Sequence, residues 1–589
     1  MKNCKLNRWF YKLALTTLLI FASCSDTFRE DFTFRGELSG TVTITPNSEV
    51  TVGMELTANY NGWEPVFFQW YRDSSGIGGA TGNKYIPTIP GSYSVAASYS
   101  TPAFSDWTWS NSVMVNEADF SQRNIEDFGQ TAIIHDVFIV RNSSEWNSAL
   151  NRIRTGAGDR NYVINIIDDF SLNGLSTSQN SFGEANGITV SIRGDHSLSL
   201  AGTGRLMVIN ANQNIIVWDI GLEGQSNNTS NIPLVQVADG EFTLKGKSSI
   251  YGNRSSGVSV NNGGTFTMHD TASVYGNNSV GVSVSSGIFT MNNNASVYSN
   301  SSNGVSVSSG TFTMNDTASV QGNSSTGVRM SGGTFIMNDS ASVYGNTHNG
   351  SGSSSGSFPG ENPPFPPYNE GRSYNGGGGV VVGSGSTFIM RENTSVNNNS
   401  TSGNNYTGGG GVWVDGGEWG VGGIFTMHDN ASVHGNTYNG GGSGVGGGGV
   451  RVTRGGIFSM NDNASVYGNT SSGSGGGVYL THDRSIFTMH NSSSVRGNAF
   501  STSGTGTNIG GGGVAIYQGT FRVTGGVVYG SNGGVNSNRV IVTGGSGAAL
   551  YIGSGTAQYG ILSGSGFFTS IGSLSTTENT FNVLNGFLY

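Results

Sequence analysis

The sequence predicts an all-β protein in which a small β-sandwich precedes a long right-handed parallel β-helix, a solenoid. Three observations lead to this prediction, and the first is repetition. One phrase recurs ten times between residues 242 and 532, and a clean copy is Gly-Thr-Phe-Thr-Met-Asn-Asp-Thr-Ala-Ser-Val-Gln-Gly-Asn at 310–323. The first five copies are spaced by 24, 23, 23 and 23 residues, and a fixed period in this range indicates stacked structural repeats. The repeated phenylalanines are Phe242, Phe266, Phe289, Phe312, Phe335, Phe388, Phe425, Phe458, Phe487 and Phe521.

The second observation is the alternation of apolar and polar residues inside each copy. Phe and Met alternate with Thr at 265–268, and Val alternates with Ser at 257–260. This period of two indicates short, half-buried β-strands. Three such strands and three turns in a repeat make one coil of a parallel β-helix. Equivalent residues of successive coils then lie about 4.8 Å apart, and no coil can bury its apolar face alone.

The third observation is where the chain varies in length. The distance from the repeated Phe to the Asn that closes the phrase is 11 residues in all ten copies. The link from that Asn to the next Gly-Val pair is 3 residues long after Asn323 but 32 after Asn346. In a solenoid such insertions form loops on one face, often the binding face. We therefore expect loops along one edge that interrupt no strand pairing, the largest at 347–378.

Residues 1–24 are expected to direct export. A basic start and a short apolar run at 13–21 end in Phe-Ala-Ser-Cys at 21–24, which resembles the lipobox of bacterial lipoproteins. The resemblance implies that Cys24 carries lipid and holds the protein on the bacterial outer membrane, at the cell surface; an ordinary cleaved signal peptide is the alternative. Two or more acyl chains give stable anchoring. Residues 25–37 are then a tether.

Residues 38–116 are expected to form the β-sandwich, because six short strands follow one another at the usual spacing. The phrases Gly-Met-Glu-Leu-Thr-Ala at 53–58 and Gln-Trp-Tyr-Arg at 69–72 resemble those of cysteine-free bacterial Ig-like domains. The resemblance implies a spacer module with Trp70 in its core. Residues 117–160 are a linker and cap with one helix at about 143–154, N-capped by Asn142 with Glu145 three residues on. Residues 161–589 are the β-helix, in irregular coils before 242 and in further coils after 532.

Composition and motifs argue against several functions. The formal charge is −9 and only Lys84, Lys245 and Lys247 follow the leader, so the sequence offers no basic face for nucleic acid. The repeats carry one acidic row, just after the Met, and we interpret it as turn chemistry, with weak calcium sites as an alternative. Its members are Asp270, Asp316, Asp339, Asp429 and Asp462. His269, His428 and His490 fall in coils that are not adjacent, so neither a metal site nor a cofactor is expected.

Two polar columns have alternative interpretations. We expect the asparagines that close the phrase to form a stacked amide ladder; they include Asn253, Asn277, Asn300, Asn323, Asn346, Asn436, Asn469 and Asn498. The tyrosines are either a column of cross-strand contacts or a platform for sugars; they are Tyr251, Tyr275, Tyr298, Tyr344, Tyr467 and Tyr529.

Residues 135–589 resemble the pectate-lyase-like right-handed β-helix proteins. Among these they resemble surface lipoproteins and adhesin-like proteins of host-associated bacteria that carry Gly-Gly-Thr-Phe-x-Met repeats, as at 263–268. The resemblance implies a non-catalytic adhesin or binding scaffold for a host glycan or matrix protein. The predicted contact residues are aromatic and lie in the Pro-rich loop 347–378, namely Phe358, Phe365, Tyr368 and Tyr374. The alternative is a polysaccharide-active enzyme, a lyase or glycoside hydrolase, which a carboxylate and basic cluster on one sheet would favour.

Overall fold

The chain forms two separate compact units, residues 1–123 and 124–589. A computed structural model describes residues 38–589, and the positions outside the description are 49, 51–53, 64, 88–90, 99–106, 116–126, 128–133, 157, 177–178, 351–375, 404–407, 418–421, 441–445, 502–509, 542–546, 563–567, 578, 586 and 589.

The N-terminal unit contains two antiparallel sheets around one core. The first sheet has the order β1 (Val42–Thr45), β2 (Leu56–Tyr60), β5 (Lys84–Tyr85). The second has the order β4 (Ser75–Gly76), β3 (Phe67–Arg72), β6 (Gly91–Ser98), β7 (Thr108–Trp109), with β8 (Val113–Val115) also paired to β6. Trp70 is fully buried in this core, as predicted, and its Nε1 donates a hydrogen bond to the Gly82 carbonyl at 2.9 Å.

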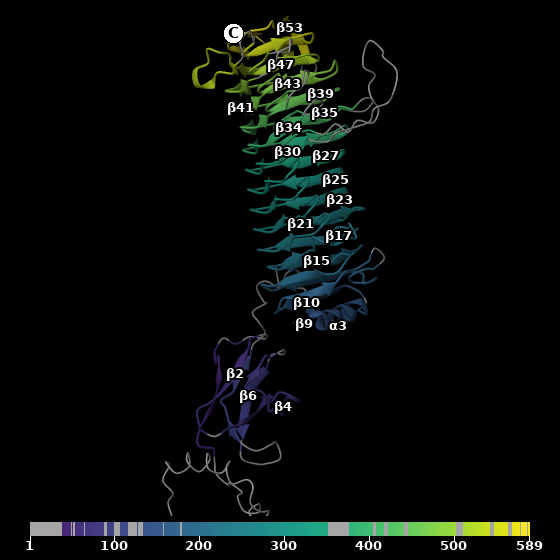
Figure 1. Cartoon of the computed structure of the whole chain (residues 1–589), viewed down its shortest axis with the longest axis vertical. Helices are drawn as coiled ribbons and strands as arrows, with labels where there is room; N and C mark the ends of the chain where they lie inside the picture. The colour runs from purple at the N-terminus through teal and green to yellow at the C-terminus, as the bar shows by residue number, and fades with distance from the viewer. Residues whose placement is uncertain are drawn as a thin grey trace, which may run out of the picture. The chain divides into compact units, whose positions relative to one another are not determined.

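The second unit is a right-handed parallel β-helix whose coils stack from β9 to β52 (Figure 1). Each regular coil supplies one strand to each of three columns. We call them the Val, Phe and Tyr sheets after the residues that repeat in them. The alternation predicted from the sequence is observed, because Val, Phe and Met point into the core while Ser, Thr and Tyr point outward.

The Val sheet is formed by β14 (Met207–Ile209), β17 (Val235–Val237), β20 (Val258–Asn261), β23 (Val282–Met291), β25 (Val305–Met314), β27 (Val328–Met330), β31 (Val380–Val382), β35 (Val412–Asp415), β39 (Val450–Thr453), β43 (Val478–Thr481), β47 (Val514–Ile516) and β51 (Leu550–Ile552). Strands β23 and β25 are long enough to continue into the Phe sheet, and the pairings from β14 to β51 are parallel.

The Phe sheet is formed by β9 (Ile134–Val140), β10 (Arg160–Ile166), β12 (Ile188–Arg193), β15 (Gln213–Trp218), β18 (Glu241–Lys245), β21 (Thr265–Met268), the ends of β23 and β25, β28 (Gly333–Met337), β32 (Ser386–Met390), β36 (Ile424–Met427), β40 (Ile457–Met460), β44 (Ile486–Met489), β48 (Thr520–Val523), β52 (Thr556–Leu562) and β53 (Phe568–Ser573). All ten repeated phenylalanines stack in one ladder, with ring centroids 4.7–5.4 Å apart. This ladder confirms the predicted register of Phe on Phe.

The Tyr sheet is formed by β11 (Phe170–Asn173), β13 (Ser197–Ala201), β16 (Gly221–Glu223), β19 (Ser249–Tyr251), β22 (Ser273–Tyr275), β24 (Ser296–Tyr298), β26 (Ser319–Gln321), β29 (Ser342–Tyr344), β33 (Ser395–Asn397), β37 (Ser432–His434), β41 (Ser465–Tyr467), β45 (Ser494–Arg496), β49 (Gly526–Val528), β54 (Phe581–Leu584) and β55 (Phe587–Leu588). Beside it runs the buried amide ladder that the sequence predicted. Each Asn side-chain oxygen accepts from the backbone N–H of the Asn one coil earlier, for example Asn323 Oδ1 from Asn300 N at 3.0 Å.

The amide ladder differs from the prediction at its C-terminal end. The 11-residue rule assigns Asn532 to the last copy, but Asn538 takes the ladder position, since its Oδ1 accepts from Asn498 N at 2.8 Å. Residues between the two, which include the short 3-10 helix η1 (Gly534–Asn536), are an insertion inside the coil. Asn532 Oδ1 instead accepts hydrogen bonds from Thr580.

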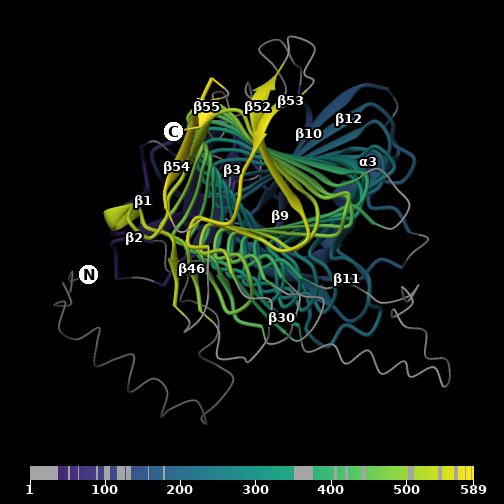
Figure 2. The ribbon, with the colours of Figure 1, turned by 90° about the horizontal axis from the view of Figure 1, so that it is seen from above.

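The predicted insertion edge contains a fourth parallel sheet. Its strands begin the insertions and stack on one another, and β30 and β46 lie on the same side of the coils in Figure 2. The strands of this insertion sheet are β30 (Thr347–Gly350), β34 (Ser400–Gly403), β38 (Thr437–Tyr438), β42 (Thr470–Ser471), β46 (Ala499–Phe500) and β50 (Arg539–Val540). The insertions do not interrupt the pairing between coils, since β27 pairs with β31 across the largest of them, and their first residues add a sheet of their own.

Both ends of the β-helix are closed by elements that break the parallel pattern. Helix α3 (Ser143–Arg154) has the predicted bounds, and Asn142 Oδ1 caps it by accepting from Ser144 N and Glu145 N, each at 3.0 Å. Its buried face packs against β9 and β11, as expected for a cap. At the other end β53 and β54 pair antiparallel with β52 and β49, so the last segment folds back where the sequence predicted further coils.

Candidate functional site

Several predicted site residues lie outside the described residues. They are Cys24, Phe358, Phe365, Tyr368 and Tyr374, and their roles stay predictions. In the described part of the chain, no helix combines the length and the apolar character needed to cross a membrane.

The acidic row forms turns, as predicted, but with a different hydrogen-bonding partner. Asp270 and Asp316 have left-handed φ values of 57° and 56°. Asp316 Oδ2 accepts from the backbone N–H of Asn293 at 2.8 Å, so the row bonds the backbone of the preceding coil rather than its own. Glu392 takes this position in its coil, which the sequence analysis missed. Within the described residues no group of three or more His, Cys, Asp or Glu side chains converges as a metal site would require.

The three histidines that follow Met have separate partners, and His428 Nδ1 lies 3.9 Å from Asp462 Oδ2. His269 Nδ1 lies 3.4 Å from Asn292 Nδ2, and His490 Nδ1 lies 2.6 Å from Thr524 Oγ1. Burial lowers the pKa of both imidazoles. These side chains therefore belong to a second, partly exposed polar row, which continues as a ladder of amides through Asn315 Nδ2 and Asn292 Oδ1 at 2.8 Å.

The tyrosine column offers edges rather than faces to a ligand. The rings of Tyr251, Tyr275 and Tyr298 stack in sequence at 5.1 and 4.9 Å, with interplanar angles of 9° and 5°. A sugar stacks on an exposed ring face, and here the inner faces are covered by neighbouring rings. The column is broken by Gln321, which pairs with Tyr298. This geometry favours cross-strand packing over a sugar platform.

The outward face of the Val sheet carries large aromatic and ionisable side chains that could contact a ligand. From β27 to β43 the second position of each strand is Arg329, Val381, Trp413, Arg451 and Tyr479. Trp413, Arg451 and Tyr479 are 2–5% exposed although they point away from the core. Burial lowers the pKa of Arg451 and raises the pKa of Tyr479 to about 12.

Glycine-rich segments form part of the cover over this buried layer. A Cβ atom on Gly408 would lie 2.5 Å from Arg451 Cδ, and one on Gly376 would lie 2.8 Å from the Trp413 ring. The segments also bond to one another, since Gly409 N donates to Gly446 O. The Gly-rich runs that precede these strands are therefore needed for close packing against large outward side chains.

A carboxylate and two basic side chains meet at the ends of β35, β39 and β43. Both oxygens of Asp415 accept from Arg454, Oδ1 from Nε at 2.7 Å and Oδ2 from Nη2, and both side chains are largely buried. His482 Nδ1 lies 2.9 Å from Thr453 Oγ1 and 3.1 Å from Thr481 Oγ1. Burial, and next the positive charge of Arg451, lower the pKa of His482, which favours the neutral imidazole at pH 7.

Asp415 was not among the predicted site residues, although the sequence contains a signal for it. In Val-Trp-Val-Asp at 412–415 the period of two places Asp on the same outward face as Trp413. It is the one carboxylate in the strands of the Val sheet as described above. A basic cluster with a carboxylate on one sheet was the feature expected of an enzyme, and the structure contains it in this form.

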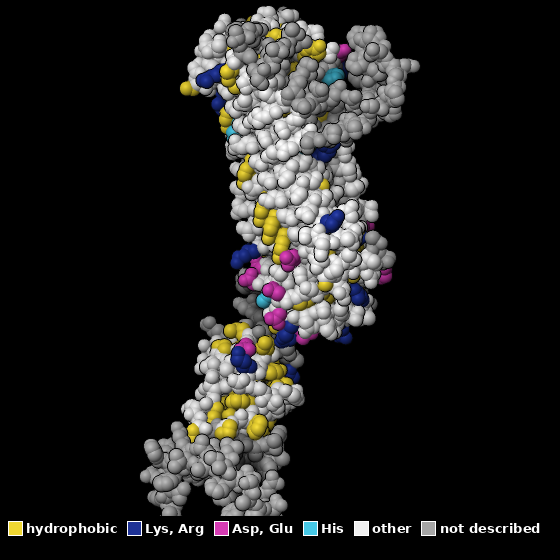
Figure 3. Space-filling view, in the orientation of Figure 1, with side chains coloured by type: hydrophobic (Ala, Val, Ile, Leu, Met, Phe, Trp, Pro, Cys, Tyr) yellow, Lys and Arg dark blue, Asp and Glu magenta, His cyan; other side chains and the backbone are white. Residues whose placement is uncertain are grey.

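A groove opens on the same face towards the N-terminal coils. Its volume is about 300 Å³, and its lining residues are Ser283, Asn303, Ser306, Val307, Ser308, Arg329 and Ser331. Every polar side chain in this lining carries a hydrogen-bond donor, and none carries a negative charge. Charged side chains are sparse on the regular part of the β-helix face seen in Figure 3, so a lone guanidinium in a groove is a distinct feature.

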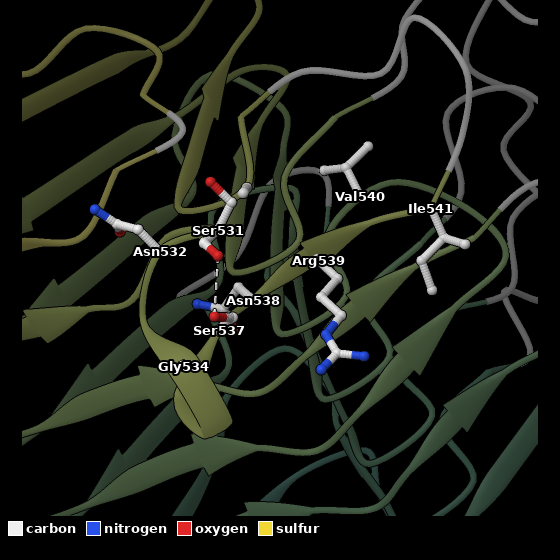
Figure 4. A pocket seen from close by; sticks show the side chains of 9 residues that line it. Ser531, Asn532, Gly534, Ser537, Asn538, Arg539, Val540 and Ile541 are labelled. Atoms are coloured by element: carbon white, nitrogen blue, oxygen red, sulfur yellow. Dashed lines mark hydrogen bonds between the residues drawn. The ribbon is translucent and has the colours of Figure 1, made fainter.

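A larger hollow of about 820 Å³ lies near the C-terminal end (Figure 4). Ser531, Asn538, Arg539 and Ile541 contribute to its lining. Asn538 is held in the amide ladder, and Ser537 Oγ donates to the Ser531 carbonyl at 3.1 Å. The polar groups of this hollow thus largely form hydrogen bonds within the protein.

A further ion cluster lies on the first coils. The Asp127 side chain is fully buried and is bound by Arg193 Nη2 at 2.7 Å and Lys245 Nζ at 3.0 Å, together with Ser191 and Trp218. Burial alone would raise the carboxyl pKa, but the hydrogen bonds and positive charges outweigh it and lower the pKa. With no exposed surface on its carboxylate, Asp127 is a structural link between residues of β12, β15 and β18.

Comparisons with known proteins add one weak likeness. The A-module of a mannuronan C-5 epimerase from Azotobacter vinelandii has a TM-score of 0.34 and 14% sequence identity to this chain, and the match covers 67% of this chain and 98% of that one. No protein-family model and no curated protein matches the sequence. The assignment of the fold therefore rests on the strand pairings described above.

Proposed function

We propose that this protein is a lipid-anchored surface protein of a bacterium, and that its β-helix is a non-catalytic scaffold that binds glycans. The observation that carries the proposal is the open groove on the Val sheet, lined by hydroxyl, amide and guanidinium groups without a carboxylate. Such a lining is suited to hold a hydroxylated ligand by hydrogen bonds. Continuous parallel sheets on either side of the groove provide a rigid support for it.

The enzymatic alternative is a polysaccharide lyase or glycoside hydrolase, and the Asp415 cluster favours it. Two features of the cluster limit this alternative. Glycoside hydrolysis uses a pair of carboxyl groups, whereas the described strands of this sheet supply one. Both oxygens of that carboxylate also accept hydrogen bonds from Arg454, so Asp415 is already engaged within the protein. His482, with a neutral imidazole, is the remaining candidate base.

The experiment that tests the proposal incubates the full chain with a panel of neutral and acidic polysaccharides and measures binding and new chain ends together. We expect binding to at least one glycan with no release of reducing or unsaturated ends. Release of such ends that is lost in Asp415→Asn or His482→Ala, but kept in the turn variant Asp316→Asn, would establish the enzyme instead. Binding to matrix proteins but to no polysaccharide would contradict the proposal that the ligand is a glycan.

The anchor is tested by Cys24→Ala. Cys4 lies in the leader, so Cys24 is the sole cysteine of the mature chain, and the variant should leave the membrane fraction for the soluble fraction. The measurement is fractionation in detergent-free buffer followed by mass analysis of the N-terminal peptide. A variant that stays with membranes as fully as the natural chain would contradict the lipid anchor.

The aromatic residues Phe358, Phe365, Tyr368 and Tyr374 are proposed as additional contact residues for a partner. The same panel, extended to matrix proteins and repeated with residues 351–375 deleted, tests them. Thr347–Gly350 is kept because it is a strand of the insertion sheet, and Gly376 because it packs on Trp413. Unchanged binding by the shortened chain would exclude the loop as a contact surface.

A further inference from the structure

The groove on the Val sheet is built by three consecutive coils. Ser283 of β23 is in register with Ser306 of β25, and Ser306 is in register with Arg329 of β27. Neighbouring strands of a sheet lie about 4.8 Å apart, so two hydroxyls and a guanidinium form a straight row with that spacing. Ser308 and Ser331, which follow the paired residues Val307 and Met330, also line the groove.

The guanidinium of Arg329 forms no ion pair with a described residue. No hydrogen bond or ion pair within the described part of the chain involves its side chain, which is half-buried. Burial lowers the pKa of Arg329, and the charge of Asp415 offsets part of this effect. An arginine remains protonated in proteins, so a desolvated positive charge stays in the groove. An anion with two coplanar oxygens would match the fork of the guanidinium and satisfy it.

The serines add donors to this positive charge. Asn303 Nδ2 donates to Ser306 Oγ at 3.1 Å, which leaves the hydroxyl hydrogen of Ser306 free to donate in turn. On the C-terminal side of Arg329 the row ends at Val381, an apolar residue that is 5% exposed. On the N-terminal side it continues with Ser283 and Ser259. The groove thus has one charged end and one neutral, hydroxyl-lined end.

We propose that this groove binds a sugar unit that carries a single oxyanion, with the carboxylate or sulfate on Arg329 and the sugar hydroxyls along the serine row. The inference rests on the proposed glycan binding and names its ligand class. A volume of about 300 Å³ is at the lower limit of small-molecule sites, so the groove accommodates one or two units. The net charge of −9 disfavours a densely charged polymer, so one oxyanion per site fits better than a polyanion.

The test measures the affinity of the full chain by calorimetry for three oligosaccharides of one backbone: neutral, carboxylated and sulfated. We expect the natural chain to prefer at least one charged form over the neutral form by about 10-fold or more, the effect of one charge-assisted hydrogen-bond pair. Arg329→Gln should abolish this preference, because the affinity for the charged form should fall by more than the affinity for the neutral form. Arg496→Gln, an arginine stacked on Tyr467 of the Tyr sheet, is the matched control and should keep it.

Two further results make the outcome decisive. Arg329→Lys keeps the charge in a folded chain, and it should retain only part of the preference if the guanidinium binds as a fork. The carboxylated and sulfated arms separate the two sources of the oxyanion. Equal charge preference in Arg329→Gln and the natural chain would overturn this inference alone. Absence of binding to all three compounds and to the wider glycan panel would overturn the proposed function as well.

Discussion

Replacing Phe312 with alanine is expected to lower the free energy of unfolding by about 3–5 kcal/mol. Phe312 has no exposed surface and lies in the middle of the phenylalanine ladder, 4.8 Å from the ring of Phe289 and 4.7 Å from that of Phe335. Truncation removes buried apolar surface and leaves a cavity. The cavity cannot collapse easily because the parallel pairing of each coil with its neighbours fixes the spacing of the backbone.

The measurement is denaturant unfolding of the full chain, with Thr313→Ser as the matched control. Thr313 neighbours Phe312 on the same strand but points outward, so its substitution should cost well under 1 kcal/mol, as surface changes do. A similar loss of stability in the two variants would contradict the assignment of inward and outward faces.

The regular coils could be predicted residue by residue because the repeat period assigns each residue its position in the stack of coils. Once the period is known, Phe312 must lie between Phe289 and Phe335, and Asn323 must lie next to Asn300 and Asn346. Positions can no longer be predicted in this way after residue 532, where the repeated phrase ends. Phe521 is paired with Ala557, and nothing in the residues after 532 marked the antiparallel return of β53 and β54.

The missed features depend on contacts between coils rather than on local pattern. The insertion sheet contains strands of two residues, such as Thr437–Tyr438, which are too short to show alternation and form only because their neighbours stack. The groove at Arg329 was hidden for a similar reason. The period of two in Val-Arg-Met at 328–330 is enough to put the arginine on the outward face, but the depth of its side chain and its serine neighbours follow from the register of three strands. Asp127 is bound by residues 64 to 118 positions away, a pairing without any sequence period.

Replacing Asn323 with alanine is expected to cost about 3–5 kcal/mol, comparable to the loss at Phe312. Asn323 is 1% exposed, and its Oδ1 accepts from both the backbone N–H and the Nδ2 of Asn300, each at 3.0 Å. Its own Nδ2 donates to the carbonyls of Gln321 and Val297 and to Asn346 Oδ1. Alanine would leave the buried N–H of Asn300 without this acceptor and the Val297 carbonyl without this donor, while Gln321 O still accepts from Ser299 N. Each buried polar group left unsatisfied costs about 1–3 kcal/mol.

The partly exposed amide row supplies the control for this substitution. Asn315 also bonds to the neighbouring coil, through Nδ2 to Asn292 Oδ1 at 2.8 Å, but water can replace that bond when it is lost. Asn315→Ala should therefore cost about 1 kcal/mol or less in the same denaturant unfolding experiment. If the two asparagine variants lose equal stability, burial does not determine how much each amide ladder contributes to the free energy of unfolding. The parallel backbone pairing alone then holds the coils in register. If Asn323→Ala is the costlier by several-fold, the buried amides are a second fixed support of the stack beside the phenylalanines.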